Sequence, residues 1–257
     1  MPVSPVFSEV LSANALAYLL LMASLLFVPV STYAQNWQLL DDVLAQYVAP
    51  VERQGVTFNA VDYKGVSQDP RYPQLIAQIE KISPETLENR DEQLAFYINA
   101  YNVYAIKMVV EHYPVDSIRD IGSFFFPVWG RTAGTIGGKP FSLDDIEHEV
   151  LRKLGEPRIH FAIVCASLSC PNLRTEAYRA EKIEQQLESQ TQTFLLNESK
   201  GLLLEGQRVR VSQIFDWFEE DFEKAGGVEQ FIRHYRDLPA RINLRANLPY
   251  NWDLNEQ

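Results

Sequence analysis

The residue types with the most chemical potential lie together in one short stretch, residues 158–171. This stretch holds both cysteines of the chain, Cys165 and Cys170, and the histidine His160. A cysteine thiolate is a strong nucleophile, and histidine has the unperturbed pKa nearest neutrality, so a histidine can remove the thiol proton. Two cysteines in an oxidising compartment can instead form a disulfide across the tight loop between them. The stretch therefore predicts a functional site without naming its reaction.

Four interpretations of the cysteines are open. A disulfide is favoured, because the count is even and the N-terminus resembles an export signal. One alternative is a thiol-dependent hydrolase or acyl transferase that uses Cys165 or Cys170 with His160 as base and Glu147 or an asparagine as orienter. Another is a metal site formed by His148, His160 and a cysteine, although no spacing matches a common zinc site. The last is a pair of unlinked buried thiols. No cofactor is indicated.

Two asparagines fall on the buried side of a long predicted helix over residues 90–112. A rotation of about 100° per residue places Gln93 and Lys107 on the solvated stripe, with Asn102 roughly 180° and Asn99 about 120° away from it. Each amide needs a partner, because an unpaired buried amide costs roughly 1–3 kcal/mol. The structural interpretation is that both amides bind neighbouring backbone. The functional interpretation is that they line a pocket and orient a catalytic side chain.

A carboxylate also falls on an apolar helix face. In the helix predicted over residues 143–154, Glu147 lies within about 40° of the centre of the apolar face, whereas His148 lies to the side or behind. Buried carboxylates are usually paired, so we expect a salt bridge from Glu147 to Arg158 or Arg174. The alternative is a carboxylate with a perturbed pKa.

Residues 159–165 are predicted to form an internal strand, because apolar side chains occupy both faces of the alternating pattern. His160 then lies near the start of the strand. Alternation places Cys165 on the face opposite His160, which argues against direct contact unless the strand ends before Cys165.

The remaining pattern predicts an α+β fold without repeats or an interdomain linker. Hairpin turns are expected at Gly137-Gly138 and at Gly206-Gln207. Further helices are expected over residues 36–49, 72–82, 181–196, 213–224 and 227–236. The predicted organisation is a signal or anchor over residues 1–34, a helical extension packed on the core over residues 35–89, and a core domain over residues 90–257.

Residues 13–30 form an uncharged, largely apolar run that ends in the small-residue sequence 31–34. This pattern is typical of a secretory signal cleaved after Ala34, although no Lys or Arg precedes the run. An uncleaved inner-membrane anchor over residues 13–30 is the alternative, and it would be the chain's sole membrane contact. The sequence thus predicts a periplasmic or secreted protein. A net charge of −11 without a basic cluster argues against a nucleic-acid partner.

Several motifs resemble the bacterial branch of domain-of-unknown-function family 547. They occur in order over about residues 90–253, at residues 96–102, 142–148, 160–171, 214–222 and 250–253. The resemblance implies a domain and no activity, and the coiled-coil segments of plant members favour a binding role for some relatives. A long helix followed by a His-bearing strand is also loosely similar to papain-type and transglutaminase-type cores. Those enzymes place a nucleophilic cysteine at the start of the helix, where residues 90–104 have none.

These patterns predict a single α+β domain with a long buried central helix packed on a mostly antiparallel sheet. A polar cluster is expected beneath the cysteine loop. The candidate catalytic and binding residues are Cys165, Cys170, His160, Glu147, Asn99, Asn102, His148 and Arg174. The leading hypothesis is an exported binding module for a peptide or a small polar ligand, and the thiol-dependent hydrolase or acyl transferase is the alternative.

Overall fold

The computed structural model describes residues 36–123 and 125–257. The predicted signal or anchor over residues 13–30 and the predicted cleavage after Ala34 lie outside this part of the chain. Among the described helices, none combines the length and the apolar character that a bilayer crossing requires.

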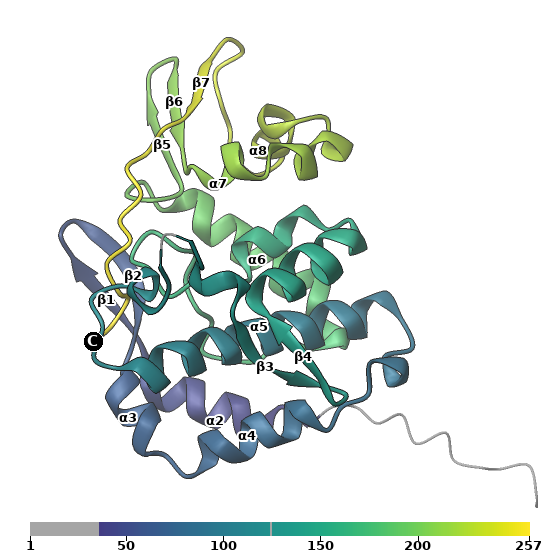
Figure 1. Ribbon diagram of the computed structural model, residues 1–257. Coiled ribbons are helices and arrows are strands. Elements are labelled where there is room, and N and C mark those ends of the chain that lie inside the picture. Colours follow the sequence, from purple (N-terminus) through teal and green to yellow (C-terminus); the bar gives the residue numbers. More distant parts are fainter. Residues whose placement is uncertain (1–35, 124) are drawn as a thin grey trace, which may run out of the picture. The chain divides into compact units, whose positions relative to one another are not determined.

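Helix α5 (Arg90–His112) runs through the middle of the described unit, as the sequence predicts (Figure 1). The Asn89 side chain begins it by accepting a hydrogen bond from the Glu92 backbone N–H at 3.0 Å, and the Glu92 carboxylate accepts one from the Glu88 N–H at 2.8 Å. The middle of α5 is buried almost all round, which explains why its apolar residues do not form a single stripe. Pro114 follows the last turn and cannot continue the helix.

Smaller helices surround α5 or form the C-terminal part. Helices α2, α3 and α4 contact one another or α5, and α6 contacts α5 and α8. The bounds of these helices are α2 Gln38–Tyr47, α3 Tyr63–Gln68, α4 Arg71–Glu80, α6 Ile183–Leu196, α7 Ile214–Trp217 and α8 Val228–Tyr235.

The α+β class is confirmed, but the strands within residues 36–123 and 125–257 form three small sheets and not one sheet under α5. Two are antiparallel hairpins, and the third adds β7 parallel to β6 beside the antiparallel pair β5–β6. Both predicted hairpin turns are present. The strands are β1 Val48–Arg53, β2 Val56–Val61, β3 Thr132–Ile136, β4 Lys139–Ser142, β5 Leu202–Glu205, β6 Arg208–Val211 and β7 Asn243–Ala246.

The predicted strand over residues 159–165 is wrong. Residues Pro157–Phe161 form a 3-10 helix, and the chain then turns into the cysteine loop. Pro157 occupies the first turn, and the Glu156 side chain accepts a hydrogen bond from the Arg158 N–H at 3.2 Å. A proline in the first turn preceded by an acidic cap is a helix start, which the alternating apolar pattern concealed.

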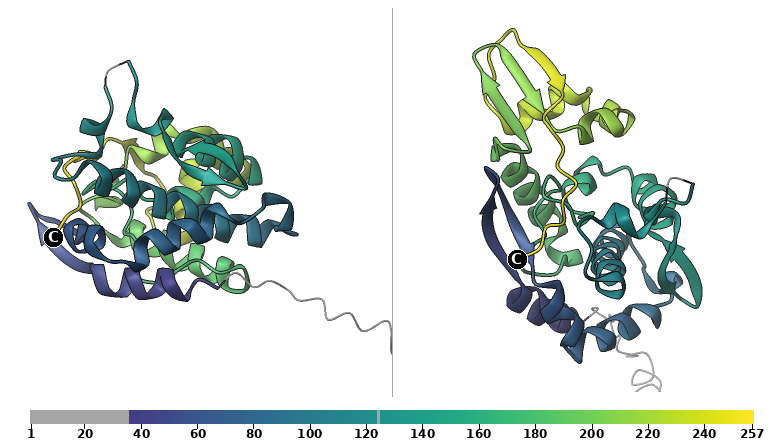
Figure 2. Two further views of the ribbon diagram at one scale, coloured as in Figure 1. Left: turned by 60° about the horizontal axis from the view of Figure 1, so that its bottom comes forward. Right: turned by 60° about the vertical axis from the view of Figure 1, so that its left-hand side comes forward.

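Apolar side chains gather in two main cores, and the second lies in the C-terminal part. The first surrounds α5 and includes side chains from Trp37 to Leu254. The second joins α6, the three-stranded sheet, α7 and α8, and Phe161 inserts into it beside Phe215. From β7 the C-terminal segment runs back to β1 and β2 (Figure 2), where Glu256 pairs with Val61.

Candidate functional site

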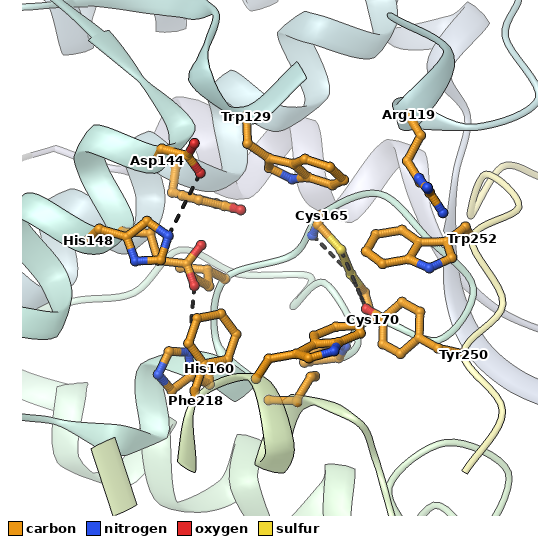
Figure 3. Close-up of a pocket in the computed structure, with 16 residues that line it drawn as sticks. Arg119, Trp129, Asp144, His148, His160, Cys165, Cys170, Phe218, Tyr250 and Trp252 are labelled. Atoms are coloured by element: carbon orange, nitrogen blue, oxygen red, sulfur yellow. Dashed lines mark hydrogen bonds and ion pairs between the residues drawn. A yellow bond between two sulfur atoms is a disulfide. The ribbon is translucent and has the colours of Figure 1, made fainter. Parts of the chain in front are cut away.

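A cavity of about 420 Å³ lies at the junction of α5, the cysteine loop, α7 and the C-terminal segment (Figure 3). Several walls are aromatic, and the rings of Trp217, Tyr250 and Trp252 contact one another at centroid distances of 4.6–5.8 Å. Pockets with apolar walls and a few placed polar groups are the usual form of a small-ligand site. Among the described residues, the Tyr, Trp and Phe side chains that line it are Tyr101, Trp129, Trp217, Phe218, Tyr250 and Trp252.

His160 lies at the edge of this cavity and is held on three sides. Its Nε2–H donates to Asp221 Oδ2 at 2.6 Å, and its ring stacks on Phe218 with centroids 4.0 Å apart. On the other side, Nδ1 lies 3.6 Å from Glu147 Oε1 and makes no hydrogen bond within the described residues. Burial by itself would lower the pKa of His160, but the Asp221 hydrogen bond and the Glu147 carboxylate outweigh it, so the pKa is raised.

Asp221 connects His160 to a second histidine. Arg152 donates to both Asp221 oxygens, from Nε at 2.7 Å and from Nη2 at 2.9 Å, and its Nη1 donates to His148 Nδ1 at 3.0 Å. Burial favours the neutral acid, but the hydrogen bonds from His160 and Arg152 outweigh it and hold the pKa of Asp221 well below its usual range. Asp221 is therefore a fixed carboxylate that stabilises a protonated His160.

The helix that carries Glu147 has an unusual turn. Residues Asp145–Leu151 are π-helical, and a 3-10 turn over Arg152–Leu154 ends at the left-handed Gly155. Single π turns occur often at functional sites. The widened turn buries Glu147 against His160 and leaves the half-exposed His148 within 3.8 Å of Asp144.

Cys165 and Cys170 are joined by a disulfide at the centre of the cavity wall. Ala166 takes a left-handed backbone conformation with φ of 58°, which reverses the chain directly after Cys165. The Tyr250 hydroxyl lies 3.5 Å from the Cys165 sulfur and 3.3 Å from the Cys170 sulfur. Beneath the loop, the buried Lys200 ammonium donates to the Cys170 carbonyl at 2.6 Å.

Charges of opposite sign lie on opposite sides of the cavity. In Figure 3 Asp144 lies on one side and the exposed Arg119 on the other, with Trp129 between them. Glu147 lines the same cavity beside His160. The Arg119 guanidinium lies 5.2 Å from the centroid of Trp252 and has no carboxylate partner within the described residues. Burial, with a contribution from Glu147, raises the pKa of Asp144, and His148 opposes this effect. The two ends of the cavity thus carry side chains of opposite type, carboxyl groups at one and a guanidinium at the other.

The structure brings together five of the eight predicted site residues. Glu147, His148, His160, Cys165 and Cys170 all line the cavity. The expected pairing of Glu147 with an arginine is wrong. Arg158 pairs with Glu156, Glu184 and Glu188, and Arg174 pairs with Glu176.

The two asparagines bind backbone, and neither lines the cavity. Asn102 donates to the Ala162 carbonyl at 3.0 Å and accepts from the Val164 N–H at 2.9 Å, so it fixes the segment between His160 and the cysteine loop. Asn99 holds both backbone groups of Tyr178 in the same way. Asn99 and Arg174 lie together in a separate small cavity, away from His160.

Sequence reasoning missed Asp221, Arg152, Arg119 and the aromatic walls as site residues. The apolar periodicity gives no signal for them, because their partners lie tens of residues away. Phe218, Asp221, Tyr250 and Trp252 do stand in the motifs that carried the family resemblance. The described residues contain no group of three or more His, Cys, Asp or Glu side chains that could hold a metal ion.

The comparisons with known proteins agree with that resemblance and add no activity. No curated protein and no solved structure matches the chain. Residues 84–195 match a family described as protein of unknown function, DUF547. This match covers α5, the π-helical turn, the cysteine loop and α6. Residues 84–195 therefore form a segment similar to the DUF547 family.

Proposed function

We propose that this domain binds a short peptide or another small zwitterionic molecule in the aromatic cavity. The observation that carries the proposal is the separation of charge: Asp144 lies at one end of the cavity and Arg119 at the other, with Trp129 between them. Glu147 adds a second carboxylate that influences Asp144. A ligand ammonium would lie near the acidic pair and a ligand carboxylate near Arg119. The aromatic rings would contact the apolar part of the ligand and any cationic group.

The polar contacts around His160 support binding more than acid–base chemistry. The imidazole of His160 lies between Asp221 and Glu147, its Nε2 is occupied by Asp221, and its raised pKa keeps it protonated to a higher pH than an ordinary histidine. Both sulfurs are joined in the disulfide and cannot act as thiolate nucleophiles in that form. No observation favours the thiol-dependent hydrolase or acyl transferase, which stays an untested alternative.

The test compares dipeptides with blocked and free ends by isothermal titration calorimetry. We expect Arg119→Gln to lower the binding affinity for a dipeptide with a free C-terminal carboxylate about tenfold or more, since a hydrogen bond to a charged group contributes about 1.5–3 kcal/mol. The affinity for the same dipeptide with a C-terminal amide should not change. Asp144→Asn should lower the affinity for a dipeptide with a free N-terminal amine and leave the affinity for its N-acetylated form unchanged. Arg241→Gln, an exposed arginine outside the cavity, is the matched control. Absence of binding by every dipeptide at millimolar concentration would refute the proposal.

The proposal places the domain outside the cytoplasm, as a periplasmic or secreted protein. What supports this placement is the apolar run over residues 13–30 and the sequence Ser31-Thr32-Tyr33-Ala34 after it, which resembles a signal cleavage site. N-terminal sequencing of the protein purified from its native compartment should begin at Gln35. A protein that retains residues 13–30 in the membrane fraction would support the anchor alternative instead.

A further inference from the structure

The two cysteines of the disulfide differ in exposure. Both line the cavity, but Cys165 is a half-buried residue, whereas Cys170 is only 2 % exposed. Thiol–disulfide exchange begins when a thiolate attacks one sulfur along the axis of the bond, so access decides which sulfur is attacked. Of the two cysteines, Cys165 is therefore the more accessible to a thiolate that enters this cavity.

The two sulfurs also differ in their hydrogen bonds. The Cys165 backbone N–H donates to the Cys170 sulfur at 3.1 Å, and the Tyr250 hydroxyl lies 3.3 Å from the same sulfur. Because a disulfide sulfur carries no proton, Tyr250 must be the donor in its sulfur contacts. Ser167 Oγ donates to the Tyr250 oxygen at 3.4 Å, which leaves the tyrosine proton directed at the sulfurs, and Ser167 Oγ also lies 3.7 Å from the Cys165 sulfur. The backbone N–H of Cys165 is thus the donor that distinguishes the Cys170 sulfur.

Tyr250 keeps its proton at neutral pH. Burial raises the pKa of its hydroxyl above the ordinary value of a tyrosine. Two donors therefore surround the Cys170 sulfur in the position where negative charge develops when the bond to Cys165 breaks. Hydrogen bonds that stabilise a thiolate make it a better leaving group.

We propose that Cys165–Cys170 is a reactive disulfide that exchanges with thiols of small molecules or cysteine-containing peptides entering the cavity. The incoming thiolate bonds to the Cys165 sulfur, the Cys165–Cys170 bond breaks, and its electron pair leaves on Cys170. A second thiolate then attacks the incoming sulfur, and Cys165 leaves as a thiolate. In total, two thiols are oxidised to one disulfide, and the protein disulfide is reduced to two cysteines. The protons released by the thiols pass to water or to the two cysteines.

The experiment uses the full, oxidised chain and glutathione as the probe thiol. Reduction at neutral pH in millimolar glutathione is followed by alkylation and mass spectrometry, while circular dichroism monitors the fold. We expect reduction within minutes with the fold retained, and about tenfold slower reduction in Tyr250→Phe. The matched control is Tyr178→Phe, because the buried Tyr178 hydroxyl has no hydrogen-bond partner within the described residues. Its rate should equal that of the unaltered protein.

A trapping experiment tests the direction of attack and does not depend on the folding of Tyr250→Phe. In Cys170→Ser, oxidised glutathione should form a mixed disulfide with Cys165 at least tenfold faster than it does with Cys170 in Cys165→Ser. Equal trapping rates would overturn the assignment of Cys165 as the attacked sulfur. A disulfide that stays intact in glutathione until the protein unfolds, or a Tyr250→Phe rate equal to that of Tyr178→Phe, would overturn the proposal. The dipeptide titration is independent of these outcomes, because it uses peptides without cysteine.

Discussion

At the residue scale, the charge state of a buried side chain depends on partners that lie far away in the sequence, and no local sequence pattern indicates them. His160 was identified from its type and its proximity to the cysteines, and Glu147 from its place on an apolar helix face. Their contact follows from both being buried beside the same cavity. Asp221, which sets the state of His160, lies 61 residues further along the chain. Its role could not be derived from periodicity, because Asp221 stands in an acidic run that is typical of a solvated face.

The first prediction concerns the proton on His160. Because Asp221 and Glu147 raise the pKa of His160 against the effect of burial, we expect it to exceed about 6.5, the ordinary histidine value. Asp221→Asn removes one carboxylate and should lower that pKa, since the burial penalty then meets less compensation. Imidazole proton NMR during a pH titration measures both values, with the exposed His234 as internal reference. An unchanged His160 titration in Asp221→Asn would show that this hydrogen bond does not set its charge.

The second prediction concerns Asn102. Replacement by leucine leaves the Ala162 carbonyl and the Val164 N–H without their partner in a buried position. We expect the free energy of unfolding, measured by urea denaturation, to fall by about 2–4 kcal/mol, since each unpaired group costs about 1–3 kcal/mol. Asn247→Leu changes an exposed asparagine and should cost less than about 0.5 kcal/mol. Equal losses in the two variants would mean that the buried hydrogen bonds contribute little.

At the element scale, helices with strong end signals were predictable and short irregular elements were not. The capped helix α5 was predicted with its observed bounds, and both glycine-containing hairpin turns were found. The strand assigned to residues 159–165 failed because a short apolar run fits a strand or a buried 3-10 helix equally well. Strand β7 has four residues and depends on its parallel pairing with β6, so nothing local indicated it.

The turn between α6 and β5 carries the third prediction, through Lys200. Its ammonium is buried against the cysteine loop, where it donates to the carbonyls of Leu168 and Cys170 and to Asn172 Oδ1. Burial lowers the pKa of Lys200 to about 7, whereas an unfolded lysine has a pKa of about 10.4. Between these values the unfolded chain binds more protons than the folded chain, so the Lys200 contribution to stability rises with pH. Below pH 7 it is constant.

Urea denaturation at several pH values tests this linkage. The unfolding free energy of the unaltered protein relative to Lys200→Met should increase from pH 7 to pH 9, by at most about 1.4 kcal/mol per pH unit. Using the difference between the two proteins removes the contribution of His160, which both share. Lys153→Met, at an exposed lysine that pairs with Glu149, is the matched control. A constant difference for Lys200→Met would contradict the lowered pKa.

At the scale of the whole molecule, the cavity belongs to more than the family segment. Residues 84–195 supply Tyr101, Glu147, His160 and the disulfide, but Trp217, Tyr250 and Trp252 lie beyond the match. The packing of the family segment also depends on residues beyond the match. Phe161 inserts into the C-terminal core among Phe194, Phe215 and Phe231. The family segment by itself would expose one side of that core. The only sequence feature that indicated a contribution from residues beyond the family segment was the pair of motifs at residues 214–222 and 250–253.

The C-terminal segment joins three distant parts of the chain. The N–H of Leu168 donates to the Asp253 carbonyl at 2.9 Å, and the N–H of Asn255 donates to the Ala166 carbonyl at 3.1 Å. Further along, the Asn255 carbonyl accepts from the Val61 N–H at 2.8 Å, and the Leu254 N–H donates to the Asp116 carbonyl at 2.8 Å. The same eight residues, 250–257, supply two aromatic walls of the cavity. The segment therefore fixes the cysteine loop from outside and closes the site.

The fourth prediction is that deletion of residues 250–257 lowers the free energy of unfolding by at least about 3 kcal/mol, because it leaves several buried backbone groups unpaired. Urea denaturation measures this loss, and faster proteolysis near residues 166–169 should accompany it. Asn255→Leu should cost about 1–3 kcal/mol, since the buried Tyr63 hydroxyl loses its acceptor at 2.6 Å. Asp253→Asn changes an exposed side chain, keeps the backbone bond to Leu168 and should be neutral. A deletion variant as stable and as protease-resistant as Asp253→Asn would mean that contacts other than those with residues 250–257 stabilise the cysteine loop.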